Sequence, residues 1–272
     1  MFTVLSVNKV HLHKSDIQYP TSNISMHLPI FYLINFSIIL SVLIFLIKYL
    51  WDMFFGENYE PPAWEHARKE GRITSELLKA SRNYPDKIRL YNFWLQIQRI
   101  NKDKVKGDFA ELGVYKGDSA RLIHLMDPDR TFHLFDTFEG FTGKDLQPET
   151  GKAATYSTKN FADTSLNKVL KNIGGNPDML KVHSGYFPQS TVGLEEISYA
   201  LVNMDADLYN PTKAGLEYFY PRLSAGGVIF IHDYNDKWEG LVKAVDEFAA
   251  TIPEKLILVP DLDSTVMFVK NQ

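Results

Sequence analysis

The chain of 272 residues contains no cysteine. It therefore has no disulfide bonds, no thiolate metal ligands and no thiol nucleophile, and nothing in its composition points to an oxidising compartment. Basic residues are not in excess either, because 29 lysines and arginines stand against 33 aspartates and glutamates, for a formal net charge of −4. Broad binding to nucleic acid is excluded on this ground, since neutralising phosphates requires clustered basic side chains. Internal repeats and low-complexity tracts are also lacking.

What the chain does have near its start is one long apolar run. Residues 28–47 (LPIFYLINFSIILSVLIFLI) carry no charge, and about twenty helical residues at ~1.5 Å each cross a hydrocarbon core of roughly 30 Å. We expect a transmembrane helix over residues 28–50, after a tail at residues 1–27. A signal peptide fits poorly, because the run is too long and Asp16 interrupts the leader. A helix packed on a partner or on a dimer mate is the other alternative.

Basic residues flank this run on both sides and leave its orientation nearly undecided. Lys9 and Lys14 precede the run, and Lys48 follows it. We expect a single-pass membrane protein whose catalytic domain lies on the cytoplasmic side. His11 and His13 lie close together in the tail; a metal site there is one interpretation, and we favour a polar tail without one.

Residues 51–104 are predicted to form a linker and a helical cap before the main domain. The stretch at 56–62 (GENYEPP) is rich in helix-breaking residues, and residues 88–98 carry apolar side chains at helical spacing. We interpret these apolar side chains as core positions, with a lid over a pocket as the alternative. The main domain is expected at residues 105–272.

A strand, a tight glycine loop and a helix follow one another from residue 108. Residues 108–113 read as a short buried strand, Gly113 and Gly117 bracket the loop, and Asp118 or Ser119 can cap the helix. Glycines let a ligand approach the backbone closely, and a helix N-terminus offers free N–H groups. The arrangement predicts a cofactor-binding loop.

Two acidic residues indicate which kind of ligand this loop would bind. Asp136 ends the next predicted strand, at 131–135, and an acid about twenty residues past the loop can accept hydrogen bonds from ribose hydroxyls. Glu111 would repel a pyrophosphate, and it suits a positively charged ligand such as the amino and sulfonium groups of S-adenosylmethionine. The alternative for Glu111 is a strand-end carboxylate bonded to loop amides.

Two later apolar runs read as buried parallel strands, and each ends in polar residues. The first ends in Asp205 and Asp207, the second in His232 and Asp233. Because the carboxyl ends of parallel strands line one crevice, we expect Asp205, His232 and Asp233 to face the ligand. Oxygen-rich strand ends suit Mg²⁺, which would lower the pKa of a substrate hydroxyl, and Asp205 or His232 would take the proton. Helix capping or a structural ion pair is the alternative for each acid taken singly.

The remaining patterns complete an alternating α/β chain. They predict a loop beside the pocket at 143–158, helices at 160–172 and 238–250, a helix capped by Asn210, and a C-terminal hairpin of strands 255–259 and 265–269. An antiparallel hairpin at the end of a parallel sheet fits a methyltransferase better than a dinucleotide dehydrogenase.

With these residues in view, the chain resembles the macrocin O-methyltransferase (TylF/MycF-type) family over about residues 71–269. The motifs that carry the resemblance are ELGVYKGDS at 111–119, DTFEGF at 136–141, FADTSL at 161–166, GYFP at 185–188, DADLY at 205–209 and DY at 233–234. The resemblance implies a Rossmann-like, class I, S-adenosylmethionine-dependent fold. It also implies methylation of a hydroxyl, typically on a sugar of a natural product, often with a divalent metal.

The resemblance also implies roles for individual residues. Cofactor contacts are implied for residues of the loop and of the strand ends: Glu111, Gly113, Tyr115, Gly117, Ser119, Asp136, Thr137, Ser184, Gly185 and Asp205. Asp205 and His232 are implied as catalytic, and Asp205, His232 and Asp233 as ligands of Mg²⁺. The family has two adjacent aspartates where this chain has His232 and Asp233, so either the metal preference is altered or His232 acts as a base without metal.

We therefore expect a membrane-tethered O-methyltransferase that acts on a hydroxyl of a small, sugar-containing molecule; a homo-oligomer stays open. One alternative is an NAD-dependent oxidoreductase or epimerase, but Glu111 opposes a pyrophosphate. The other alternative is a membrane-anchored protein that binds the cofactor without turnover. The acidic strand ends argue against it, and His232 leaves it open.

Overall fold

The computed structural model describes residues 24–55, 60–194 and 196–271. The chain divides into two compact units, Met1–Tyr59 and Glu60–Gln272. His11 and His13 lie outside the described residues, so the interpretation of the N-terminal tail stays a prediction.

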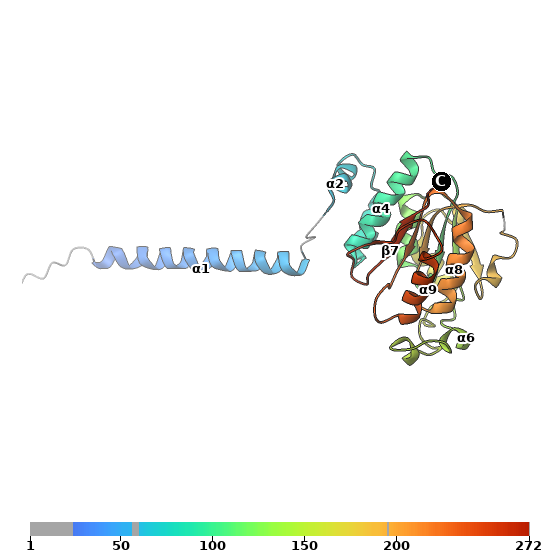
Figure 1. The fold of residues 1–272 in the computed structure, drawn as a ribbon. Coiled ribbons are helices and arrows are strands. Elements are labelled where there is room, and N and C mark those ends of the chain that lie inside the picture. The colour runs from blue at the N-terminus through green and yellow to red at the C-terminus, as the bar shows by residue number, and fades with distance from the viewer. Residues whose placement is uncertain (1–23, 56–59, 195, 272) are drawn as a thin grey trace, which may run out of the picture. The chain divides into compact units, whose positions relative to one another are not determined.

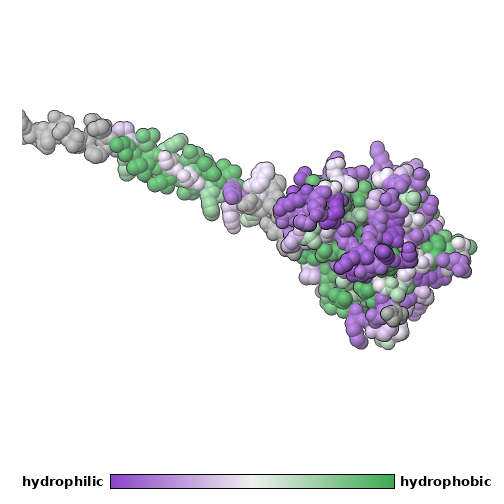
Figure 2. All heavy atoms as spheres, turned by 90° about the horizontal axis from the view of Figure 1, so that it is seen from above, coloured by the Kyte–Doolittle hydropathy of each residue, from purple (hydrophilic) through white to green (hydrophobic). Residues whose placement is uncertain are grey.

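The described part of the first unit is the helix α1 (Ile24–Phe55). Its segment Pro29–Trp51 covers 23 residues with a mean hydropathy of 2.7, and none of this segment is buried. Figure 2 shows hydrophobic side chains along this helix. By length and composition α1 is able to cross a membrane, as the sequence predicts for residues 28–50.

The second unit is built on a seven-stranded sheet with the order β3-β2-β1-β4-β5-β7-β6 (Figure 1). The strands are β1 (Asp108–Leu112), β2 (Phe132–Asp136), β3 (Leu180–Ser184), β4 (Tyr199–Met204), β5 (Leu223–Ile231), β6 (Ile257–Leu258) and β7 (Val266–Val269). Strands β1 to β5 pair in parallel, whereas β7 is antiparallel to β5 and β6 is antiparallel to β7. The predicted C-terminal hairpin at the edge of a parallel sheet is thus confirmed.

Helices cover both faces of this sheet. They are α2 (Pro62–Lys69), α3 (Ser75–Asn83), α4 (Lys87–Lys102), α5 (Asp118–Met126), α6 (Gly143–Leu146), α7 (Leu166–Ile173), α8 (Tyr209–Arg222) and α9 (Glu239–Ala249). Successive residues of a strand point to opposite faces. Accordingly, Phe109 belongs to the core cluster that holds α2 to α5 and α7, and Ala110 belongs to the cluster that holds α8 and α9. The result is a three-layer α/β unit.

The apolar face of α4 packs into the core, as predicted, and is not a lid. Leu90, Phe93 and Ile97 are fully buried. The ring of Phe93 meets the ring of Phe230 edge to face, with 5.0 Å between the ring centroids. This packing fixes α4 against β5, the strand that ends in His232.

The start of α8 differs from the sequence prediction. The helix begins at Tyr209 with Leu208 at its N-cap, so Asn210 is not the cap. The backbone N–H of Tyr209 instead donates to Oε1 of Glu149, 2.7 Å away. The cap therefore comes from the loop at 143–158, which is far away in sequence.

The start of α5 also differs. Gly117 occupies the N-cap position with a left-handed φ of 82°, and no side chain caps the helix. The hydroxyl of Ser119 donates to Oε1 of Glu111 instead. The helix predicted at 160–172 is shorter, because the chain turns at Phe161 (φ 60°) and α7 starts only at Leu166.

Gly113 joins β1 to the loop where two backbones come close together. Its φ is 85°, and a Cβ at this position would lie 2.0 Å from the carbonyl oxygen of Asp205. Gly113→Ala should therefore lower the free energy of unfolding by about 3 kcal/mol or more.

Urea unfolding of the full chain, followed by circular dichroism, measures this loss. Gly143→Ala is the matched control, because a Cβ there would meet no atom within 4 Å, and it should change the free energy of unfolding by less than about 1 kcal/mol. Equal effects of the two substitutions would contradict the prediction.

Candidate functional site

The carboxyl ends of the parallel strands meet at a cavity of about 490 Å³. This volume lies in the range of roughly 300–1,000 Å³ that is usual for small-molecule sites. The lining includes residues from both predicted halves of the site: Gly113, Tyr115, Gly117, Ser119, Asp136, Thr137 and Gly185 from the first, and Asp205, His232 and Asp233 from the second. The cavity therefore brings together residues whose separation in the sequence is more than half the length of the second unit.

Asp136 holds the glycine loop through three backbone amides. Its Oδ2 accepts from the N–H groups of Val114 (2.7 Å) and Tyr115 (2.8 Å), and its Oδ1 accepts from the N–H of Phe138 (2.7 Å). A carboxylate has about four acceptor positions. One position thus remains for a hydroxyl of a bound ligand.

Glu111 lies beneath the loop and is not among the residues that line the cavity. Its Oε1 accepts from the Ser119 hydroxyl (2.5 Å) and from the side-chain amide of Asn203 (2.9 Å), so its partners are side chains and not loop amides. Burial raises the pKa of Glu111 to about 8, against the opposing effect of the Ser119 hydrogen bond. Asn203 escaped the sequence analysis because it lies inside an apolar strand.

The other predicted cofactor residues differ in their positions. The Thr137 hydroxyl donates to the carbonyl oxygen of Gly140 (2.9 Å) and so stabilises the turn after β2. Tyr115 has a left-handed φ of 48° and donates its hydroxyl to Asp163 (2.7 Å). Gly185 lines the cavity, whereas Ser184 is exposed at the end of β3, outside the cavity lining.

An aromatic wall, defined as Phe141, Tyr156, Phe161 and Trp238, borders the same cavity. The ring centroids of Phe141 and Phe161 are 5.0 Å apart, and those of Tyr156 and Trp238 are also 5.0 Å apart. Tyr156 belongs to the 143–158 loop, which was expected beside the pocket. The faces of aromatic rings such as these bind flat rings or a cationic group.

Hydrogen bonds from the rest of the unit hold this loop. The Tyr186 hydroxyl donates to Oδ1 of Asp145 (2.6 Å), and the Thr150 hydroxyl donates to Oε2 of Glu239 (2.8 Å). Together with the cap that Glu149 provides for α8, these bonds fix the loop against α8 and α9.

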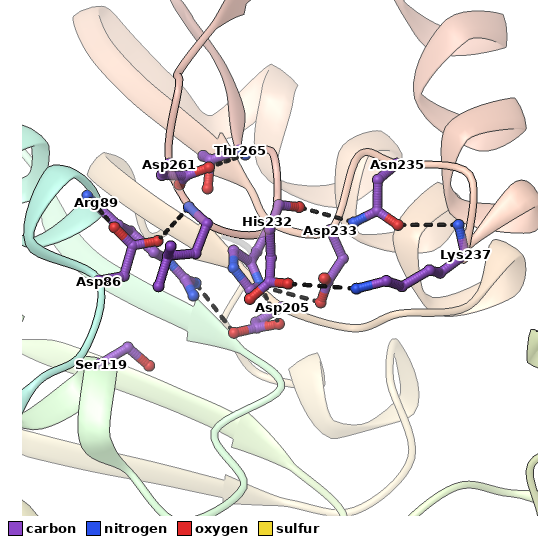
Figure 3. A network of polar contacts seen from close by, with 12 residues as sticks. Asp86, Arg89, Ser119, Asp205, His232, Asp233, Asn235, Lys237, Asp261 and Thr265 are labelled. Carbon is purple, nitrogen blue, oxygen red and sulfur yellow. Dashed lines mark hydrogen bonds and ion pairs between the residues drawn. The ribbon is translucent and has the colours of Figure 1, made fainter.

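At the opposite wall, Asp205, His232 and Asp233 converge as predicted (Figure 3). Nδ1 of His232 lies 3.2 Å from Oδ1 of Asp205 and 3.0 Å from Oδ2 of Asp233. Asp233 and Asp207 both have left-handed backbones, with φ of 62° and 61°. Such strained residues concentrate at functional sites.

The electrostatics of this cluster are set by burial and by close charges. Burial alone would lower the pKa of His232, but Asp205 and Asp233 raise it to about 10. Burial alone would raise the pKa of Asp205, but His232 and Arg89 hold it below its usual value. Burial, Asp205 and Asp233 all raise the pKa of Asp207. His232 is therefore protonated near neutral pH, and Asp205 is ionised.

Arg89 is a site residue that the sequence analysis did not identify. It comes from α4, is 5% exposed, and places Nη2 3.0 Å from Oδ2 of Asp205. Asp86 caps α4 by accepting from the Arg89 N–H, and it also accepts from the N–H of Leu262 above the site. The available signal was that Arg89 is the one charged residue in the stretch 88–98, whose apolar side chains recur at helical spacing.

A divalent cation does not suit this cluster in its present arrangement. Ligand atoms of Asp205, His232 and Asp233 lie within 4.8 Å of one another. However, Nδ1 of His232 is at hydrogen-bond distance from two carboxylates, so this nitrogen carries a proton and offers no lone pair. Mg²⁺ also prefers oxygen ligands, and Arg89 already binds Asp205. We therefore assign no step of the reaction to a metal.

The mixed sheet with its antiparallel edge, and the cavity at its carboxyl ends, define a Rossmann-like methyltransferase fold. Among solved structures, the O-methyltransferase NovP matches with a TM-score of 0.58 and 28% identity, over 68% of this chain and 81% of that chain. A model of the macrocin O-methyltransferase (TylF) family matches residues 65–269. The chain belongs to this family of O-methyltransferases.

Two curated relatives agree with this assignment. Demethyldecarbamoylnovobiocin O-methyltransferase of Streptomyces niveus is 27% identical over 226 residues, which cover 75% of this chain and 86% of that protein. The 8-demethyl-8-(2,3-dimethoxy-alpha-L-rhamnosyl)-tetracenomycin-C 4'-O-methyltransferase of Streptomyces olivaceus is 29% identical over 156 residues, which cover 54% of this chain and 60% of that protein.

The buried carboxyl of Glu111 predicts a pH effect on stability. Because its folded pKa of about 8 exceeds its ordinary value of 4.5, the folded state binds the extra proton between these values. This contribution to stability is complete below pH 4.5 and is lost as pH rises through about 8, by up to about 1.4 kcal/mol per pH unit.

Urea unfolding of the wild type and of Glu111→Gln at pH 5.5 and pH 8.5 isolates this effect. The wild type should lose more stability than the variant on going to pH 8.5, because glutamine does not titrate. A wild-type loss no larger than that of Glu111→Gln would refute the raised pKa. Glu139→Gln, at an exposed position, is the matched control and should behave like the wild type.

Proposed function

We propose that the chain transfers a methyl group from S-adenosylmethionine to a hydroxyl of a small, sugar-containing molecule. The observation that carries the proposal is the convergence of the glycine loop and Asp136 with Asp205 and Asp233 in one cavity. One half suits a nucleoside-type cofactor and the other suits a hydroxyl that loses a proton.

The residues present fit S-adenosylmethionine. The free acceptor position of Asp136 suits a ribose hydroxyl, and the left-handed Gly113 and Gly117 shape the loop that lines the cavity. The aromatic wall suits the adenine ring or the sulfonium charge. The bound methyl donor would supply an electrophilic carbon, so that the acceptor oxygen forms the C–O bond while the C–S bond electrons remain on sulfur.

The carboxyl ends of strands β4 and β5 provide the group that accepts the proton of the substrate hydroxyl. The proton becomes strongly acidic as the C–O bond forms, so a carboxylate can accept it. Asp233 and Asp205 line the cavity and fill this role in our proposal. His232, protonated with a pKa of about 10, is a donor that stabilises negative charge on the acceptor oxygen rather than the base.

The acceptor is proposed from the relatives and from the cavity. The Streptomyces olivaceus relative is named for a 4'-O-methyl transfer to a rhamnosyl tetracenomycin, and the Streptomyces niveus relative for a novobiocin precursor. Aromatic faces such as those of Tyr156 and Trp238 stack on sugar or polyketide rings. We therefore propose a glycosylated acceptor whose sugar hydroxyl points at Asp233.

Calorimetry with S-adenosylhomocysteine and with NAD tests the cofactor. The full chain should bind S-adenosylhomocysteine and should not bind NAD, because the loop lacks the G-x-G-x-x-G spacing of a dinucleotide site. Binding of NAD without binding of S-adenosylhomocysteine would refute the proposal and favour an oxidoreductase.

Asp233→Asn separates an enzyme from a binding protein without turnover. It should bind S-adenosylhomocysteine like the wild type and lower kcat/KM by on the order of 100-fold, measured as S-adenosylhomocysteine release with a panel of glycosides. Asp129→Asn is the matched control, because Asp129 is exposed in the turn before β2, at the other end of the sheet. If Asp233→Asn keeps full activity, the proposed proton acceptor is wrong.

We also propose that α1 anchors the enzyme in a membrane, with the catalytic unit on the cytoplasmic side. The support is the 23-residue unburied segment Pro29–Trp51 and the absence of a charge in residues 28–47. The rivals are a signal sequence and a helix that packs on a partner, and fractionation of cells separates these from a stable anchor.

The full chain should sediment with membranes, whereas Leu40→Arg combined with Ile44→Arg should not, because each arginine at a helix centre costs about 2.5–3.5 kcal/mol. Val192→Arg, at an 84% exposed position, is the control and should sediment like the wild type. Recovery of the native chain in the soluble fraction would exclude the anchor. Protease added to intact cells should leave a cytoplasmic catalytic unit uncut.

A further inference from the structure

Two cationic side chains lie within the acidic cluster at the ends of β4 and β5 (Figure 3). Arg89 reaches in from α4 and donates to Asp205 at 3.0 Å. His232 follows β5 and places Nδ1 between Asp205 and Asp233. The place where Mg²⁺ is implied by the family resemblance is therefore already occupied by two side chains that bond its carboxylates.

Contacts with Asp86 and Phe93 hold Arg89 in place. Its backbone N–H donates to Oδ1 of the cap residue Asp86 (2.9 Å), and its guanidinium lies 5.5 Å from the centre of the Phe93 ring. The side chain is 6% exposed. A buried arginine cannot lose its proton, so it keeps a full positive charge beside Asp205.

The carboxylate oxygens of the cluster already have partners without a metal. Oδ2 of Asp205 accepts from Arg89, whose guanidinium is permanently charged. Nδ1 of His232 lies 3.2 Å from Oδ1 of Asp205 and 3.0 Å from Oδ2 of Asp233, so the ring lies between the two carboxylates. Both oxygens of Asp205 and one oxygen of Asp233 are therefore bonded to the protein's own side chains.

A divalent cation would therefore have to displace His232 from the two carboxylates. It would also have to approach within a few ångströms of the Arg89 guanidinium. Both steps are unfavourable in a partly buried site, where charges are only weakly screened.

We propose that Arg89 and His232 replace the divalent cation in this chain, so that methyl transfer proceeds without a metal at the Asp205–His232–Asp233 cluster. The inference rests on the proposed function. In it, Arg89 is a positioning residue that holds Asp205, and His232 is a second positioning residue that bridges Asp205 and Asp233.

Binding of Mn²⁺, followed by electron paramagnetic resonance of the full chain in detergent micelles, tests the proposal without an acceptor. The wild type should leave Mn²⁺ free at millimolar concentration. His232→Asp removes the ring nitrogen that lies between the two carboxylates and adds a third carboxylate, so it should bind Mn²⁺ on the order of 100-fold more tightly than the wild type. His66→Asp places the same substitution on the exposed surface of α2 and should behave like the wild type.

Micromolar binding of Mn²⁺ by the wild type would overturn the proposal. A folded His232→Asp variant that still leaves Mn²⁺ free would overturn it too, because His232 would then not be what excludes the cation. If His232→Asp does not fold, nitrogen NMR of the wild-type histidine rings decides. The His232 signals should stay sharp with Mn²⁺ present, and selective broadening would refute the inference. Binding of S-adenosylhomocysteine, measured separately, shows whether the proposed function fails independently.

Discussion

The carboxylate of Asp205 is the point on which the candidate site depends. One of its oxygens binds Arg89 of α4, and the other binds His232 at the end of β5. A single side chain at the end of β4 thus joins three elements that are far apart in sequence. Removing it would leave Arg89 as a buried charge without its partner, which is costly. The close approach of the Gly113 backbone to the Asp205 carbonyl fixes the same strand end from the other side.

The local elements could be predicted because short-range patterns determine them. Strand β4 was predicted from the apolar run that ends at Asp205, since a continuous apolar run bounded by polar residues is typical of a strand buried on both faces. The loop after β1 was predicted from Gly113 and Gly117, which both take the left-handed backbone that glycine tolerates best. The convergence of Asp205, His232 and Asp233 followed from parallel topology alone.

The parts that could not be predicted are pairings between distant residues. Arg89 and Asp205 are 116 positions apart, and Glu149 caps α8 from 60 positions away. Any polar group that arrives in the right place can satisfy a helix N-terminus or a buried carboxylate, so the local pattern does not say which one does. For the same reason Ser119 and Asn203 are partners of Glu111, although only Ser119 was expected near the cofactor.

Because Arg89 comes from α4, the candidate site cannot be separated from the helices that precede the sheet. The methyltransferase sheet begins at Asp108, and sequence patterns separate the helices before it as a cap. Yet one of the ionic partners of Asp205 comes from those helices, so the candidate site extends upstream of the sheet. The compact unit begins at Glu60. Exchange of the segment between residue 60 and β1 among relatives would thus exchange a charge in the candidate site, while the sheet stays constant.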